Sequence, residues 1–494
     1  MKHVISSLLV ISIFGAFIIS CNKDNGDGGP VDTTPELIRV TPDNGGVGDL
    51  VKIVGKNFSM KNKENIILFG EAQAEIDFSY TDTLIVYVPA QAGNTISVTV
   101  KGIPAKNTLS FNYKQSIAVR TIAGGEGGVQ TTTTANASAK FFDAEGFCFD
   151  DNGDIYIAES GAGIIKKVSL ATGQTSLFAG VPAKSPVPDS KRWPKAVEKP
   201  VDGPLLSATF LCPKDIAYVG NGTFYVADQM HNALRKIQNG QVTTVGGCRD
   251  EAKDEWNSTG RTVVLGTDAA TNKCPLSEFV FARPTRLAFD KANNQLYLSS
   301  LNAHYVVRID LTEETVELVA GKPWNAGIVN GPLGTGRLNC PTGICIDDDQ
   351  NLYIACDYAH CVVKVDKNKN QTLICGTPDL GGSDKTGGHK EGYPSIGSAE
   401  GQAWSELCRP QAVAVDNGKI LVADFNHVIS VIDPVTYEMK LYCGEVGYND
   451  SIDGGLNTVK FHYPMAFERS PIDGCLWVSQ GQGMQDGLRK FATE

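Results

Sequence analysis

The sequence has little positive charge and lacks the motifs that mark common enzymes. Its 44 lysine and arginine residues are outnumbered by 55 aspartate and glutamate residues, the formal net charge is −11, and no long basic stretch occurs. This balance argues against nucleic acid as a partner. A P-loop, a nucleophile elbow and an H-E-x-x-H zinc motif are also missing. The sequence therefore predicts no cofactor.

The N-terminus carries an apolar run that is too short for a comfortable membrane span. The run extends from Val4 to Ile19 and is followed by Ser20 and Cys21. This pattern resembles a bacterial lipoprotein signal. Residues 1–20 are therefore expected to be a signal peptide and Cys21 to be acylated, which would anchor the chain to a membrane.

Residues 21–34 are polar and rich in glycine. Such a segment is a flexible tether with a root-mean-square reach on the order of 20 Å. The pair Lys23-Asp24 resembles the surface-export signal of Bacteroidota lipoproteins. We therefore expect an outer-membrane lipoprotein displayed on the cell surface, with periplasmic retention as the alternative. Other outer-membrane uptake proteins are candidate partners.

Most of the chain repeats one pattern of four extended runs. One copy has Ile344–Asp347 after a proline, then Leu352–Ala355, Val362–Val365 and Leu373–Gly376, with polar turns between the runs. This pattern is typical of a four-stranded antiparallel meander, the unit of a β-propeller blade.

The repeats have six first strands and six fourth-strand endings. The first strands are Gly146–Asp150, Asp215–Val219, Arg286–Asp290, Gly343–Asp347, Ala412–Asp416 and Met465–Arg469. One fourth-strand ending, within Ile117–Gly125, precedes every first strand. We expect this segment to be the outer strand of the last blade, which would close the ring and remove an exposed sheet edge.

The repeat motifs point to a known family. Tyr225–Asp228 is followed by Asn232 and Leu234, and Asn426-His427-Val428 is close to an Asn-His-Leu triplet. These residues resemble the NHL repeat, which is named for that triplet. The resemblance implies an NHL-type β-propeller over residues 115–494, and it leaves the function to be argued from a site.

Residues 35–114 form a second unit of about the size of one small sandwich. Alternation with polar neighbours predicts four core-facing side chains. These are Val51, Ile53, Ile66 and Leu68. Pro42–Phe58 and Ile85–Pro89 resemble the IPT/TIG domain, an immunoglobulin-like fold that usually serves as a spacer. The predicted fold is thus all-β, with a small immunoglobulin-like sandwich followed by a six-bladed β-propeller closed by an N-terminal outer strand.

The links from each fourth strand to the next first strand are long, and they emerge on the same face as the turns between second and third strands. Four of these links each carry one tryptophan. The tryptophans are Trp193, Trp256, Trp324 and Trp404. A flat apolar ring suits the C–H face of a sugar, so these residues are candidate glycan contacts. The alternative is that each tryptophan packs its own link against the propeller.

Cationic side chains gather where the first strands begin. They are Lys214, Arg283, Arg286 and Arg409. Because first strands line the central channel, these residues are expected to ring its mouth and to bind carboxylate or sulfate groups. The alternative is that they form ion pairs with carboxylates of neighbouring strands, with Asp215, Asp228 and Asp424 as the candidates.

Histidines recur at equivalent turns between second and third strands. They are His304, His360 and His427. Converging imidazoles would suit zinc, but we favour a structural role in which each bonds the backbone of its own blade. Glu159 is interpreted as a turn cap rather than an acid catalyst.

All cysteines except Cys21 lie in the propeller. Cys248 and Cys274 flank a long link and are the expected disulfide. Three cysteines at strand positions are expected to be buried thiols. They are Cys148, Cys345 and Cys356.

These features favour a surface lipoprotein whose propeller binds a glycan, with an acidic glycan as one option. Two alternatives remain at this point. One is a propeller enzyme, such as a polysaccharide lyase or a metal-dependent lyase. The other is a protein-binding scaffold.

Overall fold

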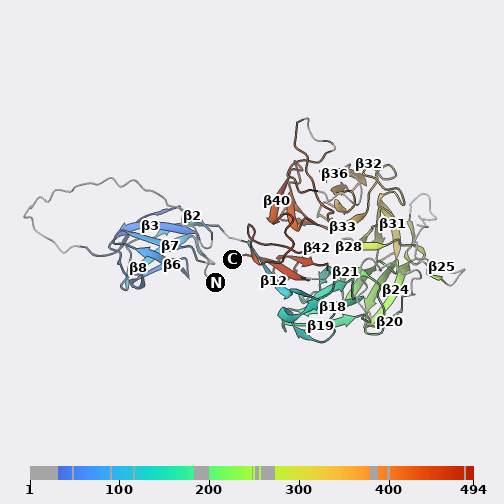
Figure 1. Cartoon of the computed structure of the whole chain (residues 1–494), viewed down its shortest axis with the longest axis horizontal. Coiled ribbons are helices and arrows are strands. Elements are labelled where there is room, and N and C mark those ends of the chain that lie inside the picture. Colours follow the sequence, from blue (N-terminus) through green and yellow to red (C-terminus); the bar gives the residue numbers. More distant parts are fainter. Residues whose placement is uncertain are drawn as a thin grey trace, which may run out of the picture. The chain divides into compact units, whose positions relative to one another are not determined.

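The computed structural model describes residues 32–46, 49–89, 92–114, 117–182, 200–247, 249–250, 255–256, 273–378, 388–395, 397, 401–482 and 485–493. The chain divides between Gln115 and Ser116 into two compact units, which are described separately (Figure 1). In the ranges just given, no helix is long and apolar enough to cross a membrane.

The first unit is a sandwich of two antiparallel sheets with the strand orders β1-β3-β7-β6 and β10-β8-β4-β5. Their bounds are β1 Glu36–Thr41, β3 Leu50–Lys56, β7 Thr83–Tyr87, β6 Glu75–Ser79, β10 Leu109–Ser110, β8 Thr95–Val100, β4 Asn65–Phe69 and β5 Ala72–Gln73. The buried faces of both sheets share one core, where Phe69 and Phe111 meet edge to face with centroids 5.0 Å apart.

The predicted core-facing side of β4 is wrong, because the buried side chains are shifted by one residue along the strand. Val51 and Ile53 are buried as expected, but Ile66 is 44% exposed. Leu68 lies on the same outer side of the strand, because alternate side chains share a face. Apolar residues occupy both faces of this strand, so alternation could not fix which face is buried. The contact of Phe69 with Phe111 decides it.

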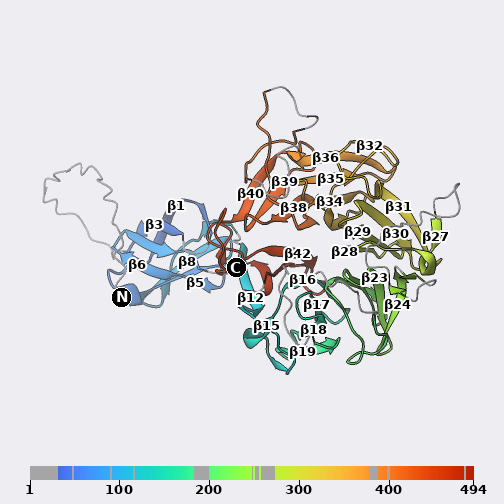
Figure 2. The ribbon, with the colours of Figure 1, turned by 45° about the vertical axis from the view of Figure 1, so that its right-hand side comes forward.

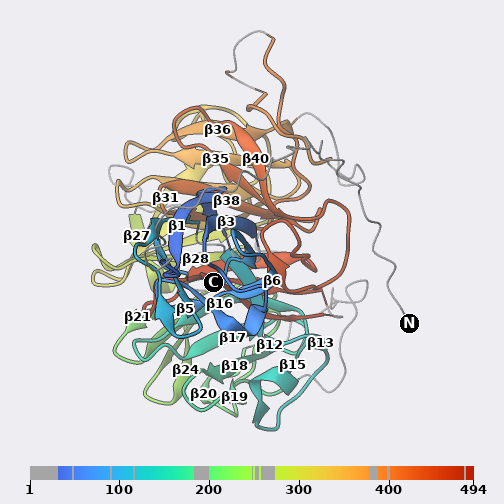
Figure 3. The same cartoon turned by 90° about the vertical axis from the view of Figure 1, so that its left-hand side faces the viewer.

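The second unit contains six sheets of four or five strands within the described residues, named here blades 1 to 6 in chain order. In each blade, four strands follow one another outward, as with β38, β39 and β40 in Figure 2 and β17, β18 and β19 in Figure 3. The first strands contact one another in the order β16, β21, β28, β33, β37, β42, and β42 contacts β16. The blades therefore surround one axis.

The blade strands have the following bounds. Blades 1 to 3 comprise β16 Ala144–Phe149, β17 Ile155–Glu159, β18 Ile164–Ser169, β19 Gln174–Ala179; β21 Pro213–Gly220, β22 Thr223–Asp228, β23 Ala233–Gln238, β24 Gln241–Gly247; and β28 Pro284–Asp290, β29 Gln295–Ser300, β30 Tyr305–Asp310, β31 Thr315–Gly321. Blades 4 to 6 comprise β33 Pro341–Ile346, β34 Leu352–Cys356, β35 Cys361–Val365, β36 Asn370–Gly376; β37 Ala412–Asp416, β38 Lys419–Asp424, β39 Val428–Ile432, β40 Met439–Gly444; and β42 Pro464–Arg469, β43 Leu476–Gln480, β44 Gly487–Thr493, β12 Ile117–Gly124.

Each blade packs between two neighbours, so its inner strands are buried on both faces. All six residues of β16 and all five of β17 are buried. Strands of this kind are nearly continuous apolar runs in the sequence. Between blades 1 and 6, Phe149 and Trp477 meet edge to face with centroids 5.6 Å apart. Trp477 is thus a core residue.

The segment that precedes all first strands pairs with the end of the chain. β12 runs antiparallel to β44, with Ala118 opposite Ala492 and Val119 opposite Phe491. The outer strand of blade 6 therefore comes from the beginning of the propeller sequence. This pairing covers the edge of β44 that would otherwise be open.

Short fifth strands in the links were not anticipated from the sequence. They are β14 Thr134–Ala135, β20 Gly203–Pro204, β27 Lys273–Pro275, β32 Gly331–Pro332 and β41 Gly454–Gly455. Each pairs with the outermost strand of a blade. Because each contributes only two or three residues, it leaves no periodic signal in the sequence.

The pairing of β12 with β44 predicts a sharp boundary for truncation. Deletion through Gly125 removes β12 and exposes β44, so the protein should aggregate or lose about 10 °C or more of thermal stability. Deletion through Tyr113 keeps β12 and should leave the unfolding midpoint of the propeller unchanged. Thermal unfolding of both truncations measures the difference, and equal stability would contradict this closure.

Candidate functional site

Six residues with a left-handed backbone stand immediately before the first strands. They are Asp143, Cys212, Arg283, Cys340, Arg409 and Tyr463, with φ between 45° and 64°. Five of them precede proline, which normally favours an extended residue before it. Such a conformation persists only where surrounding contacts hold it.

The preceding blade supplies one of these contacts through the last residue of its turn between second and third strands. His360 Nδ1 accepts the backbone N–H of Arg409 at 3.1 Å, and His427 Nδ1 accepts that of Tyr463 at 3.2 Å. His304 does the same for Cys340 at 3.1 Å. The histidines therefore have the structural role we favoured, but they bond the next blade rather than their own.

One blade uses asparagine at this position. Asn232 Oδ1 accepts the backbone N–H of Arg283 at 2.9 Å. The position thus requires an acceptor and no titratable group. Burial lowers the pKa of His304 and His360, and burial together with His462 lowers that of His427 to about 4. Across the ranges that the structure covers, no group of three histidine, cysteine or acidic side chains is placed to hold a metal ion.

Buried carboxylates at the ends of second strands make a related contact within their own blades. Asp228 accepts the backbone N–H of Leu211 at 2.8 Å, and Asp424 accepts that of Cys408 at 3.0 Å. Glu159 likewise accepts a backbone N–H, that of Phe142, at 3.0 Å. In these three blades a carboxylate therefore caps the segment that leads to the first strand.

The Arg286 side chain lies inside the channel and does not form part of an exposed ligand-binding surface. Its side chain is buried, and its guanidinium donates to Glu145 Oε2 and Met465 O, both at 3.0 Å, and to the carbonyl of Lys214. Glu145 also pairs with the ammonium of Lys214. Arg286 therefore ties blade 3 to blades 1, 2 and 6. The expectation that Arg286 and Lys214 bind a ligand is corrected: both serve a buried ion network.

The paired carboxylate in this network is Glu145, which we did not consider. Although burial opposes ionisation, the charges of Lys214 and Arg286 hold the pKa of Glu145 below its usual value. Next to the network lies a cavity of about 30 Å³, the size of a water molecule, with Asp215 and Glu468 in its wall. Burial and the neighbouring Asp215 raise the pKa of Glu468 to about 8.

Arg409 lies at the rim, and the turn of blade 4 holds it. Asp357 accepts from Arg409 Nε at 2.7 Å and from Nη2 at 3.0 Å. The guanidinium carbon lies 5.1 Å from the centroid of the Tyr358 ring and 4.6 Å from that of Phe425. The Arg409 side chain is 33% exposed. Arg283 takes the corresponding position before blade 3 and is partly exposed.

Aromatic rings continue from Arg409 toward blade 6. Phe425 contacts Tyr463 with centroids 5.1 Å apart, and Tyr463 contacts His427 at 4.3 Å and His462 at 5.0 Å. We call Tyr358, Arg409, Phe425 and Tyr463 the rim cluster. Of these four residues, only Arg409 is a candidate from the sequence. The others occupy single turn positions in separate repeats, so their proximity depends on how the blades are placed.

Of the four candidate tryptophans, Trp324 and Trp404 are the two whose side chains the structure describes. Trp193 lies outside the described residues, as does the side chain of Trp256. Trp324 is 42% exposed, and its backbone N–H donates to Ala303 in the turn of blade 3. Trp404 is 51% exposed and forms a bridge with Tyr393 near the outer edge of blade 5. Cys21 and Cys248 also lie outside the described residues, so lipidation and the Cys248–Cys274 pair stay predictions.

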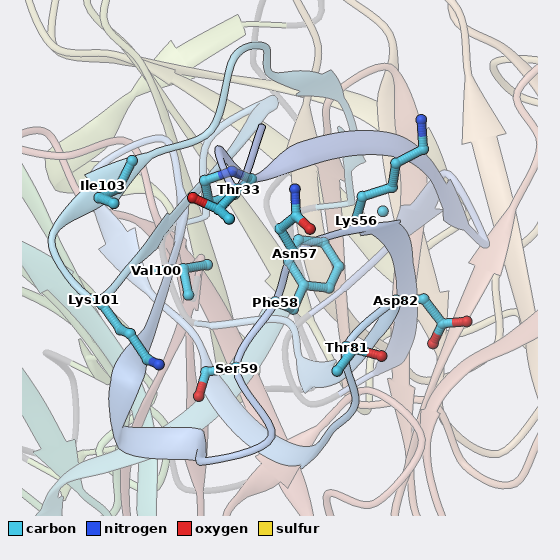
Figure 4. Close-up of a pocket in the computed structure, with 12 residues that line it drawn as sticks. Thr33, Lys56, Asn57, Phe58, Ser59, Thr81, Asp82, Val100, Lys101 and Ile103 are labelled. Carbon is cyan, nitrogen blue, oxygen red and sulfur yellow. The ribbon is translucent and has the colours of Figure 1, made fainter. Parts of the chain in front are cut away.

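The immunoglobulin-like unit has a cavity of its own, of about 590 Å³ (Figure 4). Lys56 and Lys101 stand on either side of it, with Asn57 and Phe58 between them. Phe58 is its one aromatic side chain among the described lining residues. Two exposed aromatic side chains of this unit, Phe78 and Tyr80, are not among the described lining residues of this cavity.

The two units correspond to known families. The IPT/TIG domain model matches residues 35–116, and the NHL repeat model matches residues 338–365. The chain thus contains an IPT/TIG domain and an NHL repeat. It is 25% identical over 258 residues to Protein SUPPRESSOR OF QUENCHING 1, chloroplastic, of Arabidopsis thaliana. This match covers 50% of the chain and only 22% of that relative.

Solved structures share the fold over nearly the whole chain. Auxiliary nutrient binding proteins from Bacteroides ovatus and Bacteroides thetaiotaomicron align with TM-scores of 0.57, at 15% and 13% identity. Each alignment covers 94% of this chain and 100% or 99% of the other. A protein of unknown function from Bacteroides thetaiotaomicron aligns with a TM-score of 0.53 at 18% identity, over 94% of this chain and 99% of that one. At these identities the likeness establishes the fold alone.

The Arg286 network predicts a large loss of stability without Arg286. Arg286→Ala leaves Glu145 buried with one cationic partner and two blade carbonyls without a donor, which should cost about 3–5 kcal/mol of unfolding free energy. Arg409→Ala removes a partly exposed pair and should cost roughly 1–2 kcal/mol. Denaturant unfolding compares the two variants. Similar losses would contradict the structural assignment of Arg286.

The histidine contacts predict a loss of stability in acid. The folded-state pKa of His427 lies below its unfolded value of about 6.5, so its contribution is present above that pH and is lost as the pH falls toward about 4. His427→Asn introduces the residue type found at Asn232 and keeps an acceptor that does not titrate. Its unfolding midpoint should fall less than that of the native protein between pH 7.5 and 4.5. Parallel curves would contradict the assignment.

Proposed function

We propose that the protein is a ligand-binding lipoprotein of the bacterial cell surface whose propeller binds an oligosaccharide at the rim cluster. The observation that carries this proposal is that the Arg409 guanidinium is fixed by the protein and still partly exposed. Its Nε and Nη2 are fixed by Asp357, while Nη1 makes no hydrogen bond within the described residues and the side chain is 33% exposed. A guanidinium held in this way presents its free N–H donors to a hydroxyl or carboxylate at little entropic cost.

Exposed aromatic side chains support the same face. The face in question carries the links between blades and the turns between second and third strands, and we call it the turn face. Within the described propeller, every aromatic among the exposed large apolar side chains belongs to one of these links or turns. They are Trp324, Tyr358, Trp404 and Tyr448. Such rings can cover the apolar face of a sugar, and their exposure needs a reason in a soluble domain.

The remaining parts of the chain fit this role. Residues 1–20 would direct export as a signal peptide, Cys21 would carry the lipid anchor, residues 21–34 would form a tether, and the immunoglobulin-like unit would be a spacer. Solved proteins of the same fold from Bacteroides are described as auxiliary nutrient binding proteins. We propose the outer membrane as the location, where the propeller would capture an oligosaccharide for uptake by partner proteins.

Binding should depend on the rings of the turn face. Tyr358→Ala and Trp324→Ala should each weaken binding of a recognised oligosaccharide by about 1–3 kcal/mol, because each removes a stacking surface. Calorimetric titration with neutral and uronic-acid-containing oligosaccharides measures the effect. Arg409→Ala should weaken the acidic ligands more than the neutral ones.

Val435 supplies a matched control, since it is 84% exposed in the turn between β39 and β40, on the opposite face. Val435→Ala should bind normally. The proposal fails if all turn-face variants bind like the native protein. It also fails if the native protein converts the oligosaccharide into smaller products, which would indicate a lyase.

A further inference from the structure

Blade 4 places two cysteines at the base of the turn that holds Arg409. Cys356 ends β34 and Cys361 begins β35, and they are direct partners in the register of the hairpin. Opposed residues of antiparallel strands have Cα atoms about 4.5–5.5 Å apart, a separation that disulfides span. Both side chains are fully buried and are present as thiols.

The neighbouring cysteines of this blade are placed differently. Cys375 lies opposite Val362, and its sulfur faces Ser405 and Met439 between blades 4 and 5. Cys356 and Cys361 belong instead to the apolar cluster between blades 3 and 4. Cys340 precedes Pro341, the register partner of Cys356 in β33, so it flanks this pair from the other side. Among these cysteines, Cys361 is the one directly opposite Cys356.

Three of the four residues between these cysteines contact Arg409. Asp357 accepts from its Nε and Nη2, the Tyr358 ring stacks on its guanidinium, and His360 accepts its backbone N–H. The position of this one turn therefore determines the position of Arg409. A covalent link at the base of the turn would restrict all three contacts together.

We propose that Cys356 and Cys361 form a disulfide that fixes the Arg409 turn, which replaces the buried free thiol expected at Cys356 from the sequence. The two thiols lose two protons and two electrons, and a disulfide-bearing oxidant takes them up through a mixed disulfide and leaves as two thiols. Because both sulfurs are buried between blades 3 and 4, the exchange takes place before these blades pack or when they separate. This inference does not depend on which ligand the rim cluster binds.

Thiol mapping of the full chain tests the link directly. The protein is isolated without reductant from cells that export it, and it is then unfolded in the presence of an alkylating reagent and digested. The peptides that contain Cys356 and Cys361 should be unalkylated and lighter by the mass of two hydrogen atoms. Cys148 and Cys345, which lie opposite Tyr156 and Tyr353, should be alkylated. In Cys361→Ser, Cys356 should become alkylated.

Alkylation of both Cys356 and Cys361 in the native protein would overturn the proposal, and so would a link from Cys356 to Cys340. Hydrogen exchange tests the effect on the turn. Reduction should speed exchange of the amides of His360 and Arg409 several-fold, while the turn between β33 and β34 stays unchanged. Unchanged exchange at both positions would overturn the coupling to Arg409.

Discussion

The contacts between blades depend on one backbone amide, that of the left-handed residue before the first strand. In four blades its N–H is held by a histidine or asparagine of the preceding blade, as in the bond from Arg409 to His360. Its carbonyl can accept from its own blade, as Arg283 does from Leu301. These bonds link neighbouring blades and position the turns between second and third strands. The turn face is therefore built from the contacts that hold the propeller together.

Charge is distributed unequally between the channel and the rim. Inside the channel, Arg286 donates to Glu145 and to the carbonyls of two other blades. A buried guanidinium with this set of partners stabilises the ring and offers nothing to a solute. At the rim, Arg409 keeps donors free and lies between two rings. The physical difference between these arginines favours the rim, rather than the channel mouth, as the position of the basic ligand contact.

The repeat pattern predicts most of the propeller fold, since proline before five of the six first strands and glycine after each fourth strand recur along the chain. The pairing of Ile117–Gly124 with the last strand follows from this pattern, and the immunoglobulin-like unit follows from the resemblance of residues 35–114 to the IPT/TIG domain. The buried face of β4 cannot be predicted from the sequence, because Ile66 and Ile67 are equally apolar. The ion-pair partner of Arg286 cannot be predicted either, since Glu145 lies 141 positions away in the sequence and contacts Arg286 only across the channel. Local sequence patterns predict the contacts within blades, but they carry no signal for the contacts between them.

The central claim is that ligand binds the rim cluster, and hydrogen exchange of the full chain with and without a bound oligosaccharide tests it most directly. Protection should appear in the segments 357–360, 408–411 and 425–428, which carry Tyr358, Arg409 and Phe425. The segments around Val435 and Ile472, on the opposite face, should exchange as in the free protein. Protection confined to the immunoglobulin-like unit, around Asn57 and Phe58, would contradict the claim.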